Sequence, residues 1–389
     1  MRQKIFCVNL ISGNSNNDQV ETMPLSPTFD VLLVTNQLEN TPAGGRELLC
    51  RLNHDILKDI YGERLSVLEL NKVAIRGVHP VADAFRGFID GVNNDILDRV
   101  LRIIITNKVL KIFVDGSNFG EIVRVVKEKC PNVHVYTFFH NVEVRFFWGL
   151  LRQNKTLHSL AVVMVNYLAE RKSVKHSDKI ICLSQRDSQK LRKIYGRGAT
   201  HVSPIALQDK LAKSSITSNA IMLKNKYALF VGGGFYANRA GIIWFVNQVV
   251  PRISIKTCIV GRGLEDLKEV LEVSHKVELV GSVDSLALWY QNSHFVIAPI
   301  FDGSGMKTKV AEALMFGKKI IGTPEAFAGY EDISNRIGCV CSTADEFVAA
   351  INSVEPLFAS SFDNESRSIY EKEYSFEAAR ARFIDFMGA

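Results

Sequence analysis

The chain has 389 residues, of which 47% are hydrophobic and 23% charged, which excludes a disordered chain, a collagen and a coiled-coil rod. At roughly 100–200 residues per domain, this length predicts two domains, or three. Its seven cysteines are an odd number spread over a long sequence. We therefore expect reduced thiols in a cytoplasmic protein rather than a disulfide scaffold. No run reaches the roughly 18–20 uncharged apolar residues of a membrane helix, so any membrane contact is expected to be peripheral.

Charge is distributed unevenly along the sequence. Residues 1–205 contain 28 Lys and Arg against 20 Asp and Glu, a net charge of +8, whereas residues 206–389 contain 19 against 21, a net charge of −2. Residues 144–197 alone contain 12 basic and 3 acidic side chains, a net charge of +9. This asymmetry indicates that the two halves meet different partners. The basic segment contains no recognisable nucleic-acid recognition module, so nucleic acid is not an expected partner.

Short apolar runs alternate with longer amphipathic ones from residue 31 onward. Strands rich in Val, Ile and Phe are predicted at 31–35, 67–70, 112–115, 133–139, 180–184, 228–231, 257–260, 277–280, 295–298 and 319–322. Helices are predicted at 47–61, 82–108, 121–129, 144–176, 186–195, 240–250, 264–273, 286–291, 307–316 and 345–352. The alternation predicts an α/β fold with two Rossmann-like domains, each built on a parallel sheet, facing a shared cleft.

A polar segment rich in Ser, Thr and Asn separates the two halves. We therefore predict a first domain over residues 1–205, a linker over 206–226 and a second domain over 227–389. The last helix is expected to return to the first domain.

Ligands of such sheets bind beyond the carboxyl ends of the strands, so the loops there are the candidate sites. Gly44 and Gly45 precede the first large helix, and paired glycines let backbone amides approach an anion or a sugar. The alternative is a flexible loop. His140 follows a very apolar strand, and we expect it to project into the cleft, where a neutral imidazole donates to a substrate hydroxyl or carbonyl. The alternative is a buried structural histidine.

The loop after strand 228–231 reads GGGFYA at 232–237 and fits the dinucleotide pattern G-x-G-x-x-G/A. That pattern needs an acidic residue at the end of the next strand, which here ends in GRG at 261–263. We therefore reject NAD. A phosphate-facing loop through Gly233 and Gly234, with Arg239 close behind, is the remaining interpretation.

The richest motif is the Gly-rich turn at 302–305, DGSG, which opens a helix after strand 295–298. Free N–H groups at a helix start suit a diphosphate. Lys309 and Glu312 are three residues apart and so share one helix face. A lysine near the phosphates and a carboxylate accepting the ribose hydroxyls would bind a nucleoside diphosphate without a metal ion. An ordinary surface ion pair is the alternative.

These blocks resemble, in order and over nearly the whole chain, the GT-B glycosyltransferases of family 4 and their group 1 relatives. The matching stretches are Gly44-Gly45, HNVE at 140–143, 177–196, and the series 228–245, 258–263, 277–283 and 298–330. The resemblance implies that Glu312 binds the ribose, that Lys309 neutralises the pyrophosphate, and that His140 contacts the transferred sugar. It also implies that Gly303, Ser304 and Gly305 line the donor diphosphate and sugar, and that Gly44 and Gly45 approach the donor phosphates and the acceptor.

The resemblance further implies a nucleotide-sugar donor as co-substrate, no other cofactor, no metal site and retention of the anomeric configuration. The expected acceptor is a glycan, a lipid-linked sugar or a protein, and the basic segment adds an anionic membrane surface as a partner. Many family members carry two glutamates eight residues apart, and Ser304 occupies the first of those positions. Fold alone leaves two alternatives, a nucleotide-sugar epimerase and a non-catalytic sugar-binding protein.

Overall fold

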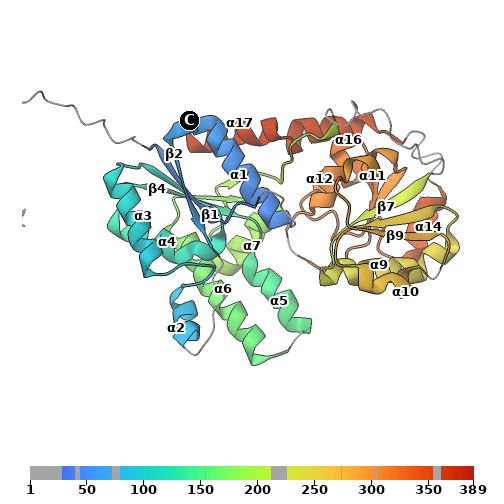
Figure 1. The fold of residues 1–389 in the computed structure, drawn as a ribbon, viewed down its shortest axis with the longest axis horizontal. Helices are drawn as coiled ribbons and strands as arrows, with labels where there is room; N and C mark the ends of the chain where they lie inside the picture. Colours follow the sequence, from blue (N-terminus) through green and yellow to red (C-terminus); the bar gives the residue numbers. More distant parts are fainter. Residues whose placement is uncertain are drawn as a thin grey trace, which may run out of the picture.

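The computed structural model describes residues 29–39, 44–71, 79–153, 155–211, 226–272, 274–303, 305–353 and 361–389. Each half contains a six-stranded sheet in which every pair of neighbouring strands is parallel. The first sheet has the order β2-β1-β3-β4-β5-β6 and the second the order β12-β11-β10-β7-β8-β9. The predicted fold class, two Rossmann-like domains with parallel sheets, is confirmed (Figure 1).

The first domain contains the following strands and helices: β1 Val31–Asn36, α1 Gly45–Tyr61, β2 Leu65–Leu70, α2 His79–Arg86, α3 Asn94–Thr106, β3 Lys111–Val114, α4 Gly120–Lys129, β4 His134–Phe139, α5 Glu143–Gln153, α6 Leu157–His176, β5 Lys179–Cys182, α7 Gln185–Tyr195 and β6 His201–Val202.

The second domain and the C-terminal segment contain these elements: β7 Tyr227–Val231, α9 Tyr236–Gln248, β8 Lys256–Val260, α10 Lys268–Leu271, β9 Val277–Gly281, α11 Ala287–Asn292, β10 Phe295–Ala298, α12 Thr308–Met315, β11 Ile320–Gly322, α13 Ser334–Ile337, β12 Gly338–Val340, α14 Ala344–Asn352, α16 Asn364–Ile369 and α17 Phe376–Met387.

Two long helices predicted from the sequence are each two helices. The segment predicted at 82–108 breaks between α2 and α3, where Gly87 and Gly91 adopt positive φ of 107° and 90° and Asn93 caps α3 by accepting from the Ile96 N–H at 2.9 Å. The segment predicted at 144–176 breaks before α6, whose first turn is capped by Thr156. Local capping stops both helices although their apolar pattern continues. The structure also adds two short edge strands, β6 and β12, that the pattern did not predict.

The chain crosses between the domains twice. After the second domain, α16 leads through a π-helical turn, Tyr370–Tyr374, into α17, which lies along α1 of the first domain (Figure 1). The ring of Phe383 on α17 stacks on Phe113 of β3 at a centroid distance of 5.6 Å. The Lys111 ammonium donates to the carbonyl oxygen of Met387 at 2.7 Å. One apolar core therefore continues from the first sheet through α17 and residues 205–207 into the second sheet.

Candidate active site

The predicted loops of the two domains meet at the start of α12. A methyl group in place of the Gly305 hydrogen would lie 3.3 Å from the carbonyl oxygen of His140 and 3.4 Å from the Cβ of Asn141. A methyl group on Gly45 would lie 3.1 Å from the hydroxyl oxygen of Thr308. The glycine pair before α1, the His140 turn and the Gly-rich turn before α12 thus lie together where the two domains are in contact.

His140 is buried at the end of β4 and forms an ion pair. Its Nε2 lies 2.9 Å from Oδ1 of Asp115, which follows β3, and 3.8 Å from the Cys50 sulfur on α1. Burial alone would lower the pKa of His140, but the charge of Asp115 and the hydrogen bonds to Asp115 and Cys50 outweigh burial and raise this pKa to about 10. We had expected a neutral donor, whereas the shift favours the protonated ring; Nδ1 has no hydrogen-bond partner within the described residues.

Asp115 is fully buried, and each of its oxygens is hydrogen-bonded. Thr35 donates to Oδ2 at 2.9 Å and Asn53 donates to Oδ1 at 2.8 Å. Burial would raise the pKa of Asp115, but His140 and these hydrogen bonds together lower it. Cys50, Asp115 and His140 also form a group of possible metal ligands within 4.8 Å of one another. The 2.9 Å separation of His140 and Asp115 is that of a charged hydrogen bond, which explains the grouping without an ion.

A buried carboxylate, that of Glu170, holds the turn after His140 through hydrogen bonds. Glu170 on α6 accepts from the backbone N–H groups of Glu143 at 2.9 Å and Val144 at 3.0 Å, and so caps the start of α5. Burial, together with the nearby Glu143, raises the pKa of Glu170 to about 7 against these hydrogen bonds. Arg46 approaches Glu143 at 3.8 Å from the start of α1. The two helix starts that border the cleft are thereby tied together.

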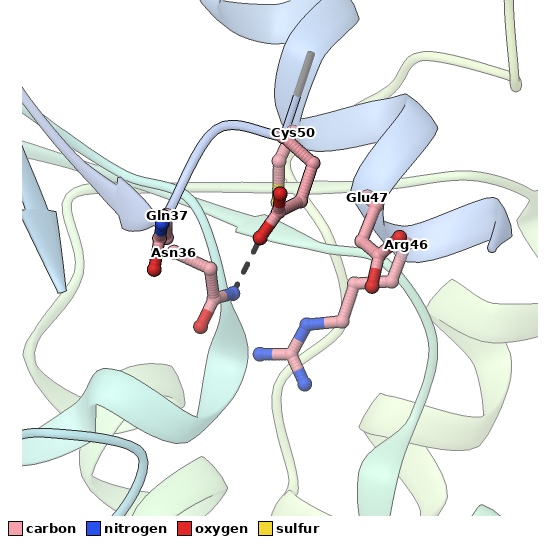
Figure 2. A pocket seen from close by; sticks show the side chains of 6 residues that line it. Asn36, Gln37, Arg46, Glu47 and Cys50 are labelled. Atoms are coloured by element: carbon pink, nitrogen blue, oxygen red, sulfur yellow. Dashed lines mark hydrogen bonds between the residues drawn. The ribbon is translucent and has the colours of Figure 1, made fainter. Parts of the chain in front are cut away.

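A cavity of about 210 Å³ opens beside these groups in the first domain and is lined by Asn36, Gln37, Glu39, Arg46, Glu47 and Cys50. Figure 2 shows the Asn36 amide and the Arg46 guanidinium pointing into the same space from β1 and α1. Asn36 is 8% exposed, and its Oδ1 has no hydrogen-bond partner within the described part of the protein. The cavity therefore offers an amide oxygen and a guanidinium to a polar ligand.

Lys309 lies near the start of α12, with its ammonium inside the second domain. The ammonium donates to Asn238 Oδ1 at 2.9 Å and lies 4.5 Å from the centre of the Phe230 ring. Burial lowers the pKa of Lys309 to about 7. Asn238 in turn donates to the carbonyl oxygen of Gly233 at 2.9 Å, so the lysine is coupled to the Gly-rich loop after β7. An anion binding next to this ammonium would restore its full charge.

Glu312 lies one helical turn after Lys309 and is held by Tyr290, whose hydroxyl donates to Oε2 at 2.8 Å. Burial raises the pKa of Glu312, while Tyr290, Lys210 and Lys309 oppose the shift. The phenol fixes one carboxylate oxygen and leaves the other outside this bond. A carboxylate fixed in this way is ready to accept further hydrogen bonds.

The Gly-rich turn before α12 has the backbone that its glycines predict. Gly303 and Gly305 have φ of 140° and 68°, a region that disfavours residues with a Cβ atom. The Asp302 carboxylate accepts from the Gly303 N–H at 2.7 Å and from the Tyr236 hydroxyl at 3.3 Å. Ser304, which we expected to line the donor, lies outside the described residues.

The loop after β7, which we expected to face a phosphate, has contacts within the protein at Arg239 and Gly234. Arg239 forms a two-pronged ion pair with Asp266 at 2.6 and 2.8 Å, so its guanidinium is already neutralised. A methyl group on Gly234 would lie 2.1 Å from the carbonyl oxygen of Gly263, so this glycine is required by packing between two loops. Gly233 is less restricted, at 3.4 Å from the Arg262 carbonyl oxygen. The contacts seen here account for Arg239 and Gly234 without a phosphate.

Known proteins resemble this chain in fold. Residues 225–354 match the family model described as glycosyl transferases group 1. Sucrose-phosphate synthase from Thermosynechococcus elongatus superposes with a TM-score of 0.70 at 14% identity, over 92% of this chain and 98% of that one. HepE from Anabaena, solved in complex with UDP, gives 0.67 at 11% identity, over 92% and 100% of the two chains. WaaG, a glycosyltransferase involved in lipopolysaccharide biosynthesis, gives 0.63 at 12%, over 92% and 100%. No curated protein sequence matches the chain.

The chain has the GT-B fold of these structures, and residues 225–354 resemble the group 1 glycosyl transferases. Three side chains of the site, Asp115, Asn238 and Tyr290, were not predicted from the sequence. The position of Asp115 at the end of a predicted strand was an available signal, because it shares the carboxyl edge of the sheet with His140. Asn238 and Tyr290 gave no such signal, since only packing brings them to Lys309 and Glu312.

Proposed function

We propose that this protein is a glycosyltransferase that moves a sugar from a nucleoside-diphosphate sugar to a glycan, a lipid-linked sugar or a protein, with retention of anomeric configuration and without a metal ion or a further cofactor. The proposal rests on one observation: the start of α12 lies against the His140 turn of the other domain. Helix α12 contains Lys309 and Glu312. One side of the cleft then holds the nucleotide and the other side reaches the sugar.

In this proposal the second domain binds the donor. Glu312, held by Tyr290, accepts the ribose hydroxyls, and Lys309 with the amides of the Gly-rich turn faces the diphosphate. Gly44 and Gly45 present amides from the first domain. Arg239 is not assigned to the diphosphate, because its guanidinium forms an ion pair with Asp266. HepE was solved with UDP and with UDP-glucose, which makes uridine donors the first probes.

Bond cleavage leaves negative charge on the β-phosphate, and fixed positive charge and amide dipoles stabilise that charge most strongly in a site closed to water. In this proposal the His140 ring, held by buried Asp115 at 2.9 Å, faces the sugar side, where a protonated ring would add positive charge. Retention follows if the acceptor attacks from the face that the leaving diphosphate vacates. The acceptor proton then passes to a phosphate oxygen, and the bond to the leaving oxygen breaks as the new glycosidic bond forms.

Incubation with labelled UDP-, GDP- and dTDP-sugars tests this function. A glycosyltransferase transfers the label or slowly hydrolyses one donor, an epimerase isomerises it, and a binding protein only retains it. A thermal-shift screen of the same donors identifies the base, because a ligand of the native state raises the melting temperature. Epimerised donor, or retention without turnover in the presence of acceptors, would refute the proposal.

The described helices include none that is long and apolar enough to span a bilayer. We further propose peripheral binding to an anionic membrane through the adjoining ends of α5 and α6. Four apolar side chains there are exposed: Trp148, Leu157, Leu160 and Met164. Residues 144–169 contain Arg145, Arg152 and Lys155 and no Asp or Glu. An apolar surface rimmed by cations fits an anionic lipid surface, at about 1 kcal/mol per nearby cation.

Not every cation of the basic segment 144–197 is free at the surface, and the end of α6 gives an example. Lys172 there donates to Glu121 at 2.7 Å, so it is not a free surface cation. Vesicle co-sedimentation should show binding that falls between about 50 and 500 mM salt, as screening shortens the Debye length. Leu157→Glu should weaken it, whereas Ile105→Glu, a matched exposed apolar residue on α3, should not. Equal loss in both variants, or no binding at low salt, would refute membrane docking.

A further inference from the structure

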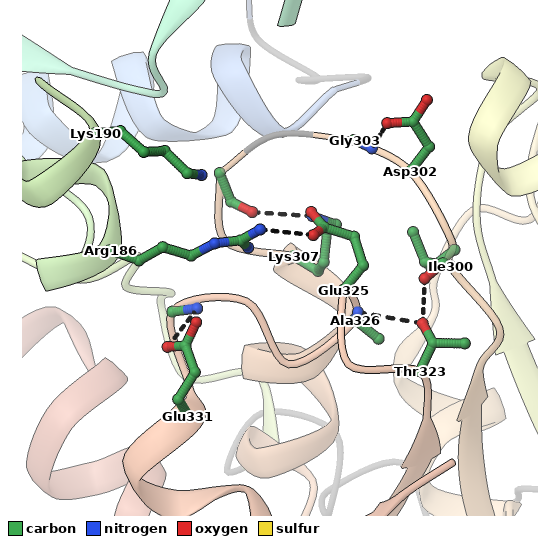
Figure 3. A network of polar contacts seen from close by, with 12 residues as sticks. Arg186, Lys190, Ile300, Asp302, Gly303, Lys307, Thr323, Glu325, Ala326 and Glu331 are labelled. Atoms are coloured by element: carbon green, nitrogen blue, oxygen red, sulfur yellow. Dashed lines mark hydrogen bonds and ion pairs between the residues drawn. The ribbon is translucent and has the colours of Figure 1, made fainter. Parts of the chain in front are cut away.

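A three-residue ion network crosses the cleft beside the Gly-rich turn (Figure 3). Glu325 lies in the turn after β11, and each of its two carboxylate oxygens accepts a hydrogen bond from a different domain. Its Oε2 accepts from Arg186 of α7, in the first domain, at 2.8 Å, and its Oε1 accepts from Lys307 at 3.0 Å. The three side chains are between 12% and 34% exposed. The sequence analysis gave none of them a role.

Lys307 links this network to the backbone of the Gly-rich turn. Its ammonium also donates to the carbonyl oxygen of Gly305 at 3.0 Å, and its own carbonyl accepts from the Tyr330 hydroxyl at 3.1 Å. Met306 packs on Gly329, and a methyl group on Gly329 would lie 2.4 Å from the Cγ of Met306. The shape of residues 305–307 is therefore set by the segment that contains Glu325.

The same turn is also in contact with the first domain. Gly305 lies against the backbone of His140, and Phe146 of α5 stacks on Phe235 at a centroid distance of 6.0 Å. The structure thus has the domains in contact at the cleft. A carboxylate that is shared between Arg186 and Lys307 can hold both only while the domains are in contact.

We propose that Glu325 is a positioning residue that couples closure of the two domains to the shape of the Gly-rich donor turn. When the domains close, Arg186 neutralises one oxygen of Glu325 and fixes the carboxylate that orients Lys307, and Lys307 then holds Gly305. When they open, this constraint is lost and the turn relaxes. The role in donor binding rests on the function proposed above, whereas the coupling itself does not. Burial lowers the pKa of Lys307, and Glu325 opposes that shift, so the loss of Glu325 also removes the partner of a buried ammonium.

The test uses the full-length chain and the variants Arg186→Ala and Glu325→Gln, with Lys193→Ala as the control on the exposed side of α7. Two readouts need no ligand. Small-angle scattering measures closure, and amide hydrogen exchange measures order in residues 305–307. We expect both variants to increase the radius of gyration and to speed exchange of these amides about fivefold, the scale of one partly exposed ion pair, while the control matches the wild type.

Donor chemistry is measured in parallel. Both variants should raise the donor KM with UDP-sugars about fivefold and raise hydrolysis relative to transfer, because an open cleft admits water. Glu325→Asp keeps the charge on a shorter side chain and should restore the exchange of the turn only in part. The double variant should be no worse than Glu325→Gln alone, because Glu325→Gln already removes the ion pair that Arg186→Ala removes.

The outcomes separate the coupling from the function. If scattering and exchange change as expected but no donor is consumed, the coupling stands and the proposed function fails. If Arg186→Ala opens the domains without altering exchange of the turn, or alters neither, the coupling is refuted. Should Glu325→Gln fail to fold, Arg186→Ala decides alone, because its side chain lies partly in solvent and its loss leaves no cavity in the core.

Discussion

Replacement of Lys309 by Met should make the protein more stable and less able to bind a diphosphate. In the folded chain burial lowers the pKa of this ammonium from 10.5 to about 7. At about 1.36 kcal/mol per pKa unit, burying the charge costs roughly 5 kcal/mol. Met fills a similar volume without charge but leaves Asn238 Oδ1 without its donor, which costs about 1–3 kcal/mol. The net expectation is a free energy of unfolding about 2–4 kcal/mol higher at pH 6.5.

The stability difference between Lys309→Met and the wild type should vary with pH in a direction that the pKa of Lys309 sets. Below pH 7 Lys309 is protonated in both the folded and the unfolded chain, so the folded state carries the full penalty. Between pH 7 and 10.5 the unfolded chain binds more protons, and the penalty fades as the pH rises. The stability difference between Lys309→Met and the wild type should therefore shrink steadily over this range.

Urea unfolding of both proteins at pH 6.5, 8 and 9.5 measures this difference, and calorimetry with UDP measures binding. We expect UDP binding to the wild type to take up protons near pH 7, because the diphosphate recharges the ammonium. A stability difference that does not vary with pH, or a variant that binds UDP as tightly as the wild type, would refute the reasoning.

Three other substitutions test the rest of the site. Glu312→Ala should weaken nucleotide binding by about 1.5–3 kcal/mol, the usual loss of charge-assisted hydrogen bonds; unchanged UDP affinity by calorimetry would remove Glu312 from the ribose site. His140→Ala should lower turnover more than UDP affinity, and its stability deficit should be largest below pH 6.5 and fade at higher pH, as expected for a raised folded-state pKa; an equal loss of UDP binding would place His140 at the nucleotide. Gly234→Ala should destabilise the fold by about 1–3 kcal/mol through its clash with Gly263, whereas Gly44→Ala, with nothing within 4 Å, should not, as measured by thermal unfolding.

The sequence by itself predicted the architecture because the relevant signals are local. Apolar runs of strand length alternating with amphipathic segments predict parallel sheets, and loops after strands must meet at one edge of each sheet. That rule brings Gly45 and His140 to one edge of the first sheet and the turn before α12 to the corresponding edge of the second, whereas the packing of the two domains brings the edges together. Helix ends were harder to predict from the sequence, because the caps at Asn93 and Thr156 interrupt an apolar pattern that otherwise continues.

Only the tertiary structure decided which charged groups are free to act. From sequence Arg239 was a candidate phosphate ligand, yet Asp266, 27 residues away, neutralises it. His140 was predicted as a neutral donor, yet Asp115, 25 residues away, lies 2.9 Å from its ring and raises its pKa. Glu325 gains its role only where the two domains meet. The charge and availability of a side chain depend on partners within a few ångströms in space, and long-range packing, unlike hydrophobic periodicity, brings those partners from distant parts of the sequence.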